Sequence, residues 1–235
     1  MRPGKRNSAR FPAVNSPYRV VAIDGPAASG KSSVARELAQ RIGFEYVNSG
    51  AMYRAVTWHV LEQGVPPEDP AAIANLLEAT RLDCTLGPGG SLILINGVDP
   101  AKYLFGERVN EAVSSVSKVP RVREVLVDRM RAYAYDHDVV MEGRDIGSVV
   151  FPRTPYKFYI DASPEVRLRR RQAQGLRDQI AARDQADSSR TTSPLVVAPD
   201  AHVIDSSNLT IDEVVAEIVR QLKMKGLEIN QRISE

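Results

Sequence analysis

The chain has 235 residues, which is enough for one sizeable hydrophobic core with room for inserted subdomains. Its 43% hydrophobic and 26% charged residues are ordinary for a globular protein, and a formal net charge of +2 points to no particular partner. A single cysteine, Cys84, excludes an intrachain disulfide and a cysteine-based metal cluster. No apolar run approaches the ~18 residues of a membrane span, so we expect a cytoplasmic protein without a membrane partner.

Residues 1–17 differ from the rest of the chain. They carry four basic residues and three prolines, and the first acidic residue is Asp24. No apolar segment follows the charges, so the pattern is not typical of a secretory signal. We predict a disordered basic tail or a mis-assigned start, with a weak polyanion-binding arm as the alternative.

Strand-like runs alternate with helical segments over residues 18–235, which we interpret as one domain. The five runs that carry this pattern are Tyr18–Ile23, Phe44–Val47, Asp138–Met141, Tyr156–Ile160 and His202–Ile204. Such alternation predicts an α/β fold in which helices cover both faces of a parallel sheet. Near the end of the chain, Thr210 and Glu213 form a capping box that predicts the start of a C-terminal helix.

A phosphate-binding loop follows the first of these runs. Residues 25–32 read GPAASGKS and fit G-x-x-x-x-G-K-[ST], with a helical segment directly after them. Glycines let backbone N–H groups point inward, and the helix N-terminus adds positive potential. Lys31 can reach the outer phosphates and Ser32 can hold Mg²⁺, whereas an ordinary glycine-rich turn would leave both unexplained. The predicted ATP-binding residues are Gly25, Pro26, Ala27, Ala28, Ser29, Gly30, Lys31, Ser32 and Ser33.

A second candidate site follows Val47, where residues 48–54 read NSGAMYR. Ligands gather at the carboxyl ends of strands in open α/β sheets, so Ser49 is placed as a helix N-cap or a ligand contact. Arg54 lies in the second helical turn, where a guanidinium can grip a second phosphate through two hydrogen bonds. A capped helix with a surface arginine explains the spacing equally well.

The third core run leads into a turn with the sequence MEGRDIG, residues 141–147. Two acids and an arginine between glycines are costly to place at a sheet edge without a function. Arg144 can hold a phosphate, while Glu142 or Asp145 can orient it, bind a base edge or hold Mg²⁺ through water. A turn with a local ion pair is the structural alternative.

Two stretches interrupt the alternation. Residues 66 to about 130 contain a short helical segment, Ala71–Ala79, and two strand-like runs, Arg81–Leu86 and Ser91–Ile95, which together predict an inserted α+β lobe. The second stretch, Val166–Pro199, is a basic helix, whose start pattern lies at Ser163–Glu165, followed by a polar, serine-rich segment that is typical of a mobile lid.

The lid segment is rich in arginine. Residues 161–190 contain no lysine and seven arginines, which are Arg167, Arg169, Arg170, Arg171, Arg177, Arg183 and Arg190. Arginine stabilises the charge that spreads over the equatorial oxygens during phosphoryl transfer. We expect most of the seven to lie on a solvated helix face and two or three to touch the ligand, with Arg183 and Arg190 favoured because they lie in the loop after the helix.

The remaining candidates favour structural roles. His59, His137 and His202 lie on unrelated segments, which indicates structural rather than catalytic histidines. Trp58 and Tyr53 have the spacing of a packed helix face rather than of a base-stacking box, although Tyr53 faces the candidate site.

Taken together, these motifs resemble the bacterial cytidylate kinase family over nearly the whole chain from about Arg19. The matching pieces are Ile23–Pro26 with the phosphate loop, Ser49–Arg54, Pro120–Glu124, Gly143–Gly147 with Val149–Pro152, Asp161–Pro164 and Arg183–Asp184. The resemblance implies the nucleoside-monophosphate-kinase fold: a five-stranded parallel sheet, an inserted monophosphate-binding lobe at 63–130 and a lid region at 163–199. It implies a monomer that, with Mg²⁺, phosphorylates CMP and dCMP from ATP to CDP and dCDP.

The resemblance also implies roles for individual residues. Lys31 acts with the phosphate-holding arginines, which would be Arg54, Arg144 and Arg190. Sugar or phosphate contacts would be Ser49, Arg183 and Asp187, with Tyr53 and Glu142 beside the substrate. The cytosine-reading residues would be Ser114, Arg123 and Asp145.

That last trio has a physical rationale. Cytosine presents an amino donor at N4 and acceptors at N3 and O2, so Asp145 can accept while Arg123 and Ser114 donate. Uracil places an acceptor opposite Asp145 instead. Sites built on buried hydrogen bonds can reject such a partner by roughly 10⁴-fold, which predicts a clear preference for CMP over UMP.

The sequence departs from the family pattern at several positions. Glu142 stands where some members carry aspartate, Tyr103–Phe105 occupies a stretch where an Ile-Arg pair is common, and Ala186 replaces a frequent lid arginine. The lid segment is also shorter than in many members.

Two other functions remain open on the sequence. One is a P-loop kinase for uridylate, thymidylate or a small metabolite, against which the pairing of Arg123 with Asp145 argues. The other is a nucleotide-binding switch or a nucleic-acid-associated NTPase that uses the basic tail. The chain has no Asn-Lys-x-Asp base-reading motif of a GTPase, and we expect no nucleic-acid partner.

Overall fold

The computed structural model describes residues 19–87, 89–173 and 195–229, so the predicted tail at 1–17 lies outside it. The strands are β1 (Val20–Asp24), β2 (Glu45–Asn48), β3 (Leu82–Gly87), β4 (Gly90–Ile95), β5 (Val139–Gly143), β6 (Tyr156–Asp161) and β7 (His202–Asp205). The helices are α1 (Lys31–Ile42), α2 (Ser49–Glu62), α3 (Pro70–Glu78), α4 (Glu107–Val116), α5 (Pro120–Asp136), α6 (Pro164–Ala173) and α8 (Ile211–Met224). Two short helical turns, η1 (Ala101–Tyr103) and η2 (Ile146–Val150), complete the described elements.

Five of the strands form one parallel sheet in the order β2-β5-β1-β6-β7. This confirms the predicted α/β class and its five-stranded parallel sheet. In register, Asp24 at the end of β1 lies opposite Gly143 of β5, and Asn48 at the end of β2 lies opposite Glu142. The sheet therefore brings the loops that follow β1, β2 and β5 to one edge, although the sequence separates them by up to 119 residues.

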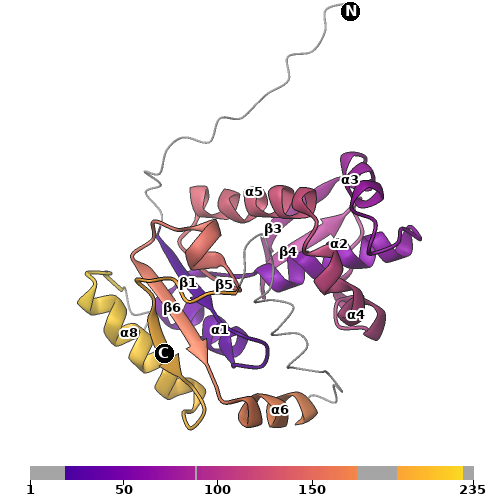
Figure 1. Cartoon of the computed structure of the whole chain (residues 1–235). Coiled ribbons are helices and arrows are strands. Elements are labelled where there is room, and N and C mark those ends of the chain that lie inside the picture. Colours follow the sequence, from indigo (N-terminus) through magenta and orange to yellow (C-terminus); the bar gives the residue numbers. More distant parts are fainter. Residues whose placement is uncertain (1–18, 88, 174–194, 230–235) are drawn as a thin grey trace, which may run out of the picture.

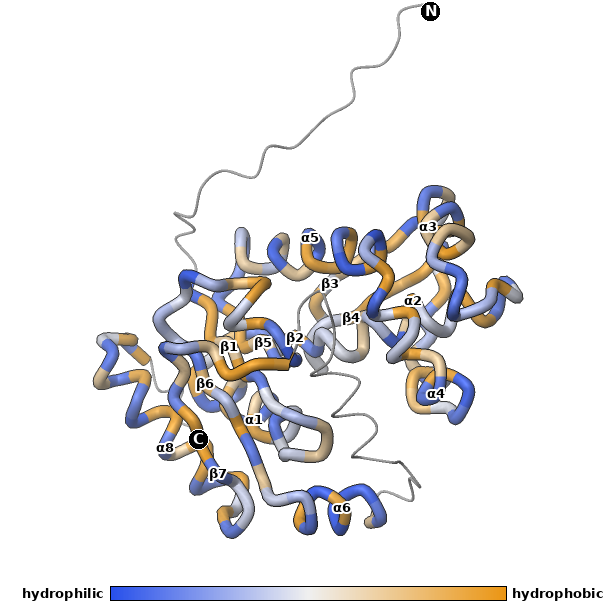
Figure 2. The backbone as a smooth tube through the Cα atoms, in the orientation of Figure 1, coloured by the Kyte–Doolittle hydropathy of each residue, from blue (hydrophilic) through white to orange (hydrophobic). Residues whose placement is uncertain are grey.

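Each face of the sheet is covered by its own pair of helices (Figure 1). Val21 and Ile23 point into a cluster with α1 and α8, whereas Val20 and Ala22 point into one with α2 and α5. This alternation follows from the two-residue period of a strand. Along α8 the backbone alternates between hydrophobic and hydrophilic residues (Figure 2), and the predicted Thr210–Glu213 capping box begins it.

A small antiparallel pair, β3 and β4, lies beside the edge strand β2. Its strands confirm both runs expected in the inserted stretch, and the expected short helix, α3, begins at Pro70 under an Asp69 N-cap. The pair is joined to β2 by the N–H of Asn48, which donates to the Ser91 Oγ at 3.1 Å. The helices α2, α3 and α4 lie at the same end of the molecule as this pair (Figure 1).

Among the helices of the described ranges, none combines the length and the apolar composition that crossing a bilayer requires.

Candidate functional site

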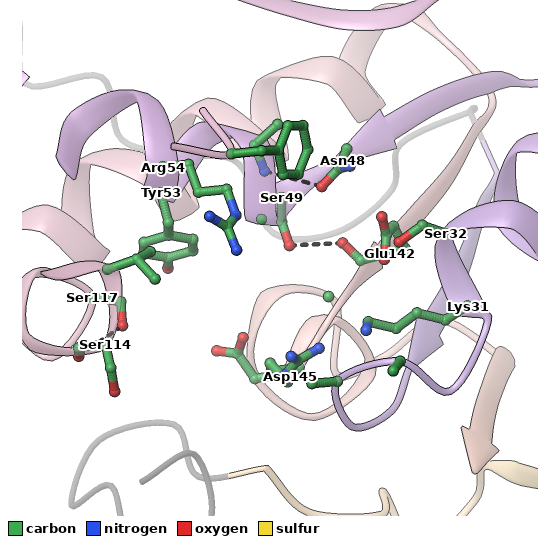
Figure 3. Close-up of a pocket in the computed structure, with 18 of the residues that line it drawn as sticks. Lys31, Ser32, Asn48, Ser49, Tyr53, Arg54, Ser114, Ser117, Glu142 and Asp145 are labelled. Carbon is green, nitrogen blue, oxygen red and sulfur yellow. Dashed lines mark hydrogen bonds between the residues drawn. The ribbon is translucent and has the colours of Figure 1, made fainter. Parts of the chain in front are cut away.

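A cavity of about 680 Å³ opens at the carboxyl ends of β1, β2 and β5. It brings together most of the predicted site residues, which are Ala27, Ala28, Gly30, Lys31, Ser32, Ser33, Ser49, Tyr53, Arg54, Ser114, Arg123, Glu142, Arg144 and Asp145. Lys31 and Ser32 lie on one side of it, and Tyr53, Ser114 and Ser117 lie on the opposite side (Figure 3). The predicted Arg183, Asp187 and Arg190 fall outside the described residues.

The phosphate loop ends at the N-terminus of α1. Gly30 precedes the helix with φ 91°, in the left-handed region that favours glycine, and has no side chain with which to cap the helix. No acidic residue occupies the first turn. Without a capping side chain, the first backbone N–H groups of the helix can bind an anion, and the helix dipole favours one there.

Three predicted loop residues, Gly25, Pro26 and Ser29, do not line the cavity. The carbonyl groups of Gly25 and Pro26 instead accept hydrogen bonds from cavity residues: Arg144 donates to Gly25 at 2.9 Å and Lys31 Nζ to Pro26 at 3.0 Å. Gly25 is also required sterically, because a Cβ there would lie 2.1 Å from the carbonyl oxygen of Ile160. The motif residues thus divide between ligand-facing and supporting positions.

Two arginines of α6 support the same loop and so do not belong to the solvated helix face expected for most of the seven. Arg167 is 8% exposed and donates to the carbonyls of Ala162 and Ala27 at 3.1 and 3.4 Å. Arg170 donates to the carbonyl of Ser29 at 3.1 Å. Their spacing of three residues places both on one helix face, and this spacing is the signal that could have identified them.

The start of α2 differs from the sequence expectation in one detail. Asn48, not Ser49, is the N-cap, and its side chain accepts from the N–H of Ala51 at 3.0 Å. Ser49 is the first helical residue, and its Oγ donates to the carbonyl of Glu142 at 2.7 Å (Figure 3). Ser49 therefore ties the end of β2 to the end of β5 and lines the cavity at the same time.

Arg54 reaches the cavity from α2 and is held there by hydrogen bonds to the segment after η1 and to α4. Its Nη1 donates to the carbonyl of Leu104 at 2.9 Å and to Asn110 Oδ1 at 2.7 Å. The guanidinium lies 5.2 Å from the centre of the Phe105 ring. Of the two interpretations left open by the sequence, the position in the cavity wall favours the ligand-facing one.

Arg123 and Asp145 form a buried ion pair in the cavity, with side chains that are each 6% exposed. The Arg123 guanidinium also lies 5.6 Å from the centre of the Tyr53 ring. Nearby, the Ser114 Oγ is buried and has no hydrogen-bond partner among the described residues. A buried polar atom without a partner is unfavourable in a finished core, so its place in the wall fits a ligand contact.

Glu142 is 3% exposed and accepts a hydrogen bond from the Tyr46 hydroxyl at 3.0 Å. Burial and the adjacent Glu142 carboxylate raise the pKa of Tyr46. Among residues 19–87, 89–173 and 195–229, no group of three or more His, Cys, Asp or Glu side chains could hold a metal ion alone. Glu142 and Ser32 both line the cavity, however, and Mg²⁺ is commonly bound by one carboxylate together with substrate phosphates.

Several cavity residues had no predicted role. Arg36, Phe105, Val113 and Ser117 line it, and each comes from the non-motif part of a helix or loop. Arg171, one of the seven lid arginines, also lines the cavity. By contrast, His59 hydrogen-bonds to Thr80 and His202 to Glu217, away from the cavity, in agreement with structural roles.

Comparison with known proteins places the chain in a family. Residues 21–224 match the family model described as cytidylate kinase. The cytidylate kinase of Geobacillus kaustophilus (strain HTA426) is 44% identical over 210 residues, which cover 85% of this chain and 94% of that protein. The cytidylate kinase of Corynebacterium efficiens is 42% identical over 224 residues, which cover 90% and 97%.

A solved structure of shikimate kinase from Acinetobacter baumannii matches more distantly, at 13% identity and a TM-score of 0.47, with 91% of this chain and 97% of that one covered. The sequence matches decide the family: the chain belongs to the cytidylate kinases, and it is therefore a nucleotide-binding phosphotransferase.

Proposed function

We propose that this kinase transfers the γ-phosphoryl group of ATP to CMP and dCMP, and that the cavity residues divide the work between the two nucleotides. One observation carries the proposal: the phosphate loop and the Arg123–Asp145 pair face the same cavity of about 680 Å³. A cavity of this kind can hold two nucleotides with their phosphates facing each other.

The acceptor in this reaction is a phosphate oxygen, which is already anionic near neutral pH, so no general base is required. Catalysis then rests on positioning and charge neutralisation. Lys31 and the first N–H groups of α1 would hold the ATP phosphates, and Arg54 and Arg144 would hold the phosphate of CMP. The lid arginines Arg183 and Arg190 would complete this set when the lid closes and excludes water.

The residues present also fit Mg²⁺, because Ser32 and the buried Glu142 carboxylate line the phosphate end of the cavity. When bound with ATP, the ion would neutralise charge on the phosphate oxygens. Ser32 would contribute its hydroxyl, and Glu142 its carboxylate, directly or through water.

Base selection would rest on the opposite wall. Asp145 would accept from the cytosine amino group, while Arg123 and Ser114 would donate to N3 and O2. The unpartnered Ser114 Oγ and the buried carboxylate support this assignment. Tyr53, Ser49 and Asp187 would complete the sugar and phosphate contacts.

We also propose a cytoplasmic monomer that takes up small-molecule substrates and has no nucleic-acid partner. The support is the formal net charge of +2 over 235 residues, which gives no strong attraction for a polyanion. Sedimentation with and without substrates tests the monomer, and salt-dependent binding to single-stranded DNA, lost on deleting residues 1–17, would overturn the absence of a nucleic-acid partner.

The decisive experiment is a panel of monophosphates with ATP and Mg²⁺, followed by coupled ADP release. We expect kcat/KM for CMP and dCMP to exceed that for UMP by roughly 10⁴-fold, with AMP, GMP and TMP lower still. Comparable values for CMP and UMP would overturn the cytosine assignment and leave the P-loop kinase chemistry intact.

A further inference from the structure

Asp24, at the carboxyl end of β1, is a buried acid to which the mechanism above assigns no role. Its side chain belongs to a residue that is 5% exposed and does not line the cavity. Burial raises its pKa to about 6, an effect that the charge of Asp145 reinforces and that Lys31 and two backbone N–H groups oppose. Burying a carboxylate costs free energy unless hydrogen bonds or charges compensate for the lost water, so its position calls for a structural or functional explanation.

The reason lies in its contacts. Oδ1 of Asp24 accepts from the N–H of Ile146 at 2.8 Å, and Oδ2 accepts from the N–H of Gly147 at 2.7 Å. These are the first two N–H groups of η2, the turn that directly follows Asp145. Asp24 therefore caps this turn from 122 residues away in the sequence.

The residue in the ordinary capping position is Asp145, and its side chain makes no capping hydrogen bond. Its backbone carbonyl accepts from Val149 and Val150 at 2.9 and 3.1 Å, while its carboxylate pairs with Arg123 in the cavity. An aspartate at this position ordinarily accepts from the N–H of the second or third residue of the helix. Here the N–H of the second residue, Gly147, is already bound by Asp24.

The same contact fixes the neighbouring residues. A Cβ at Gly147 would lie 3.3 Å from Asp24 Oδ2 and 3.2 Å from Lys157, so the turn is packed tightly against the acid. On the other side, Arg144 donates to the carbonyl of Gly25, the residue after Asp24. The end of β1 thus holds both flanks of the segment that presents Arg144 and Asp145.

We infer that Asp24 is a positioning residue for base selection: by capping η2 it releases the Asp145 carboxylate to read the base. The inference rests on the proposed function, because it supposes that Asp145 discriminates cytosine from uracil. Without the Asp24 carboxylate, the Ile146 and Gly147 N–H groups would compete with Arg123 and the base for Asp145.

The test measures the ratio of kcat/KM for CMP to that for UMP at pH 8, where Asp24 is ionised, in four proteins: wild type, Asp24→Asn, Asp145→Asn and the double variant. Asparagine at position 24 keeps one acceptor but turns an N–H toward a backbone donor. We expect Asp24→Asn to lower the ratio at least 10-fold, with KM for ATP within twofold of wild type. We also expect the double variant to discriminate no worse than Asp145→Asn alone, because both changes act through one carboxylate.

The matched control is Asp138→Asn, at the opposite end of the β1–β5 pair. Asp138 also accepts from a backbone N–H, that of Arg19, and lies outside the cavity. We expect it to destabilise the protein and leave the ratio unchanged. If Asp24→Asn does not fold, Gly147→Ala disturbs the same contact from the other side while keeping the carboxylate, and it should lower the ratio as well.

The outcomes separate the two proposals. A wild-type enzyme without CMP preference would overturn the proposed function. If the wild type prefers CMP and Asp24→Asn has the same CMP-to-UMP ratio of kcat/KM, only the positioning role is overturned. The positioning role is also overturned if Asp24→Asn raises KM for ATP at a constant CMP-to-UMP ratio, because Asp24 would then act through the phosphate loop.

Discussion

The two walls of the cavity are built in different ways. The phosphate wall, meaning the loop residues from Ala27 to Ser33, is one contiguous segment that leads from β1 into the first turn of α1. Its geometry depends on backbone N–H groups and the left-handed Gly30. The base wall, meaning the residues proposed to read the base, takes Ser114 from α4, Arg123 from α5 and Asp145 from the end of β5. A contiguous wall can be recognised as a sequence motif, whereas an assembled wall exists only when the sheet order and helix packing are correct.

The comparison predicts that the largest loss of rate comes from the contiguous wall. Lys31→Ala should lower kcat about 10³-fold, because a cation near the transferring group stabilises charge that grows in the transition state. Steady-state kinetics with ATP and CMP measures the effect, and the exposed Lys118→Ala is the control. Turnover near that of wild type would remove Lys31 from the mechanism.

In the assembled wall, the largest effect should fall on selectivity rather than on rate. Asp145→Asn should lower the CMP-to-UMP ratio of kcat/KM by roughly 100-fold while kcat for CMP falls less, because the change alters a base contact and not the phosphates. Asp136→Asn, an exposed acid of α5, serves as the control. If kcat collapses at a constant ratio, Asp145 is a metal or positioning residue instead.

The contacts of α6 show that even the contiguous wall is held by residues distant in the sequence. Arg170→Gln removes the hydrogen bonds to the carbonyls of Ser29 and Ser206. We expect KM for ATP to rise about 10-fold, since a charge-assisted hydrogen bond is lost, with little change in KM for CMP. Arg169→Gln, on the exposed face of the same helix, should change neither value.

The smallest effect is expected far from both walls, where β1 begins. Burial alone would raise the pKa of Asp138, but hydrogen bonds from Arg19 lower it overall. This stabilisation is present at pH values above the unfolded pKa of 3.8 and is lost as the pH falls through the lower folded value. Asp138→Asn should therefore lower the free energy of unfolding by about 1 kcal/mol at pH 7.

Thermal unfolding of both proteins between pH 7 and pH 2.5 measures that difference. The difference should shrink as the pH falls below 3.8, because Asp138 of the wild type then loses its charge and its ion pair with Arg19. A difference that stays constant over this range would contradict an electrostatic origin. At any pH at which both proteins are folded, wild type and Asp138→Asn should have the same kinetic constants.

The sequence alone determined the elements and the phosphate wall. Hydrophobic periodicity and turn residues are local, so all five core strands, the β3–β4 pair and the capped start of α8 were predicted within a few residues. The phosphate loop was predicted for the same reason, because its chemistry lies within nine consecutive residues. The family resemblance supplied the base-wall trio.

How distant residues come to share one site depends on the packing of the strands and helices. Arg167 and Arg170 hold the phosphate loop, and Asp24 caps η2, because of which strand ends lie side by side. A hydrogen bond between residues more than 100 positions apart leaves no periodic signal in the chain. It forms because the order β2-β5-β1-β6-β7 places those strand ends together at one edge of the sheet.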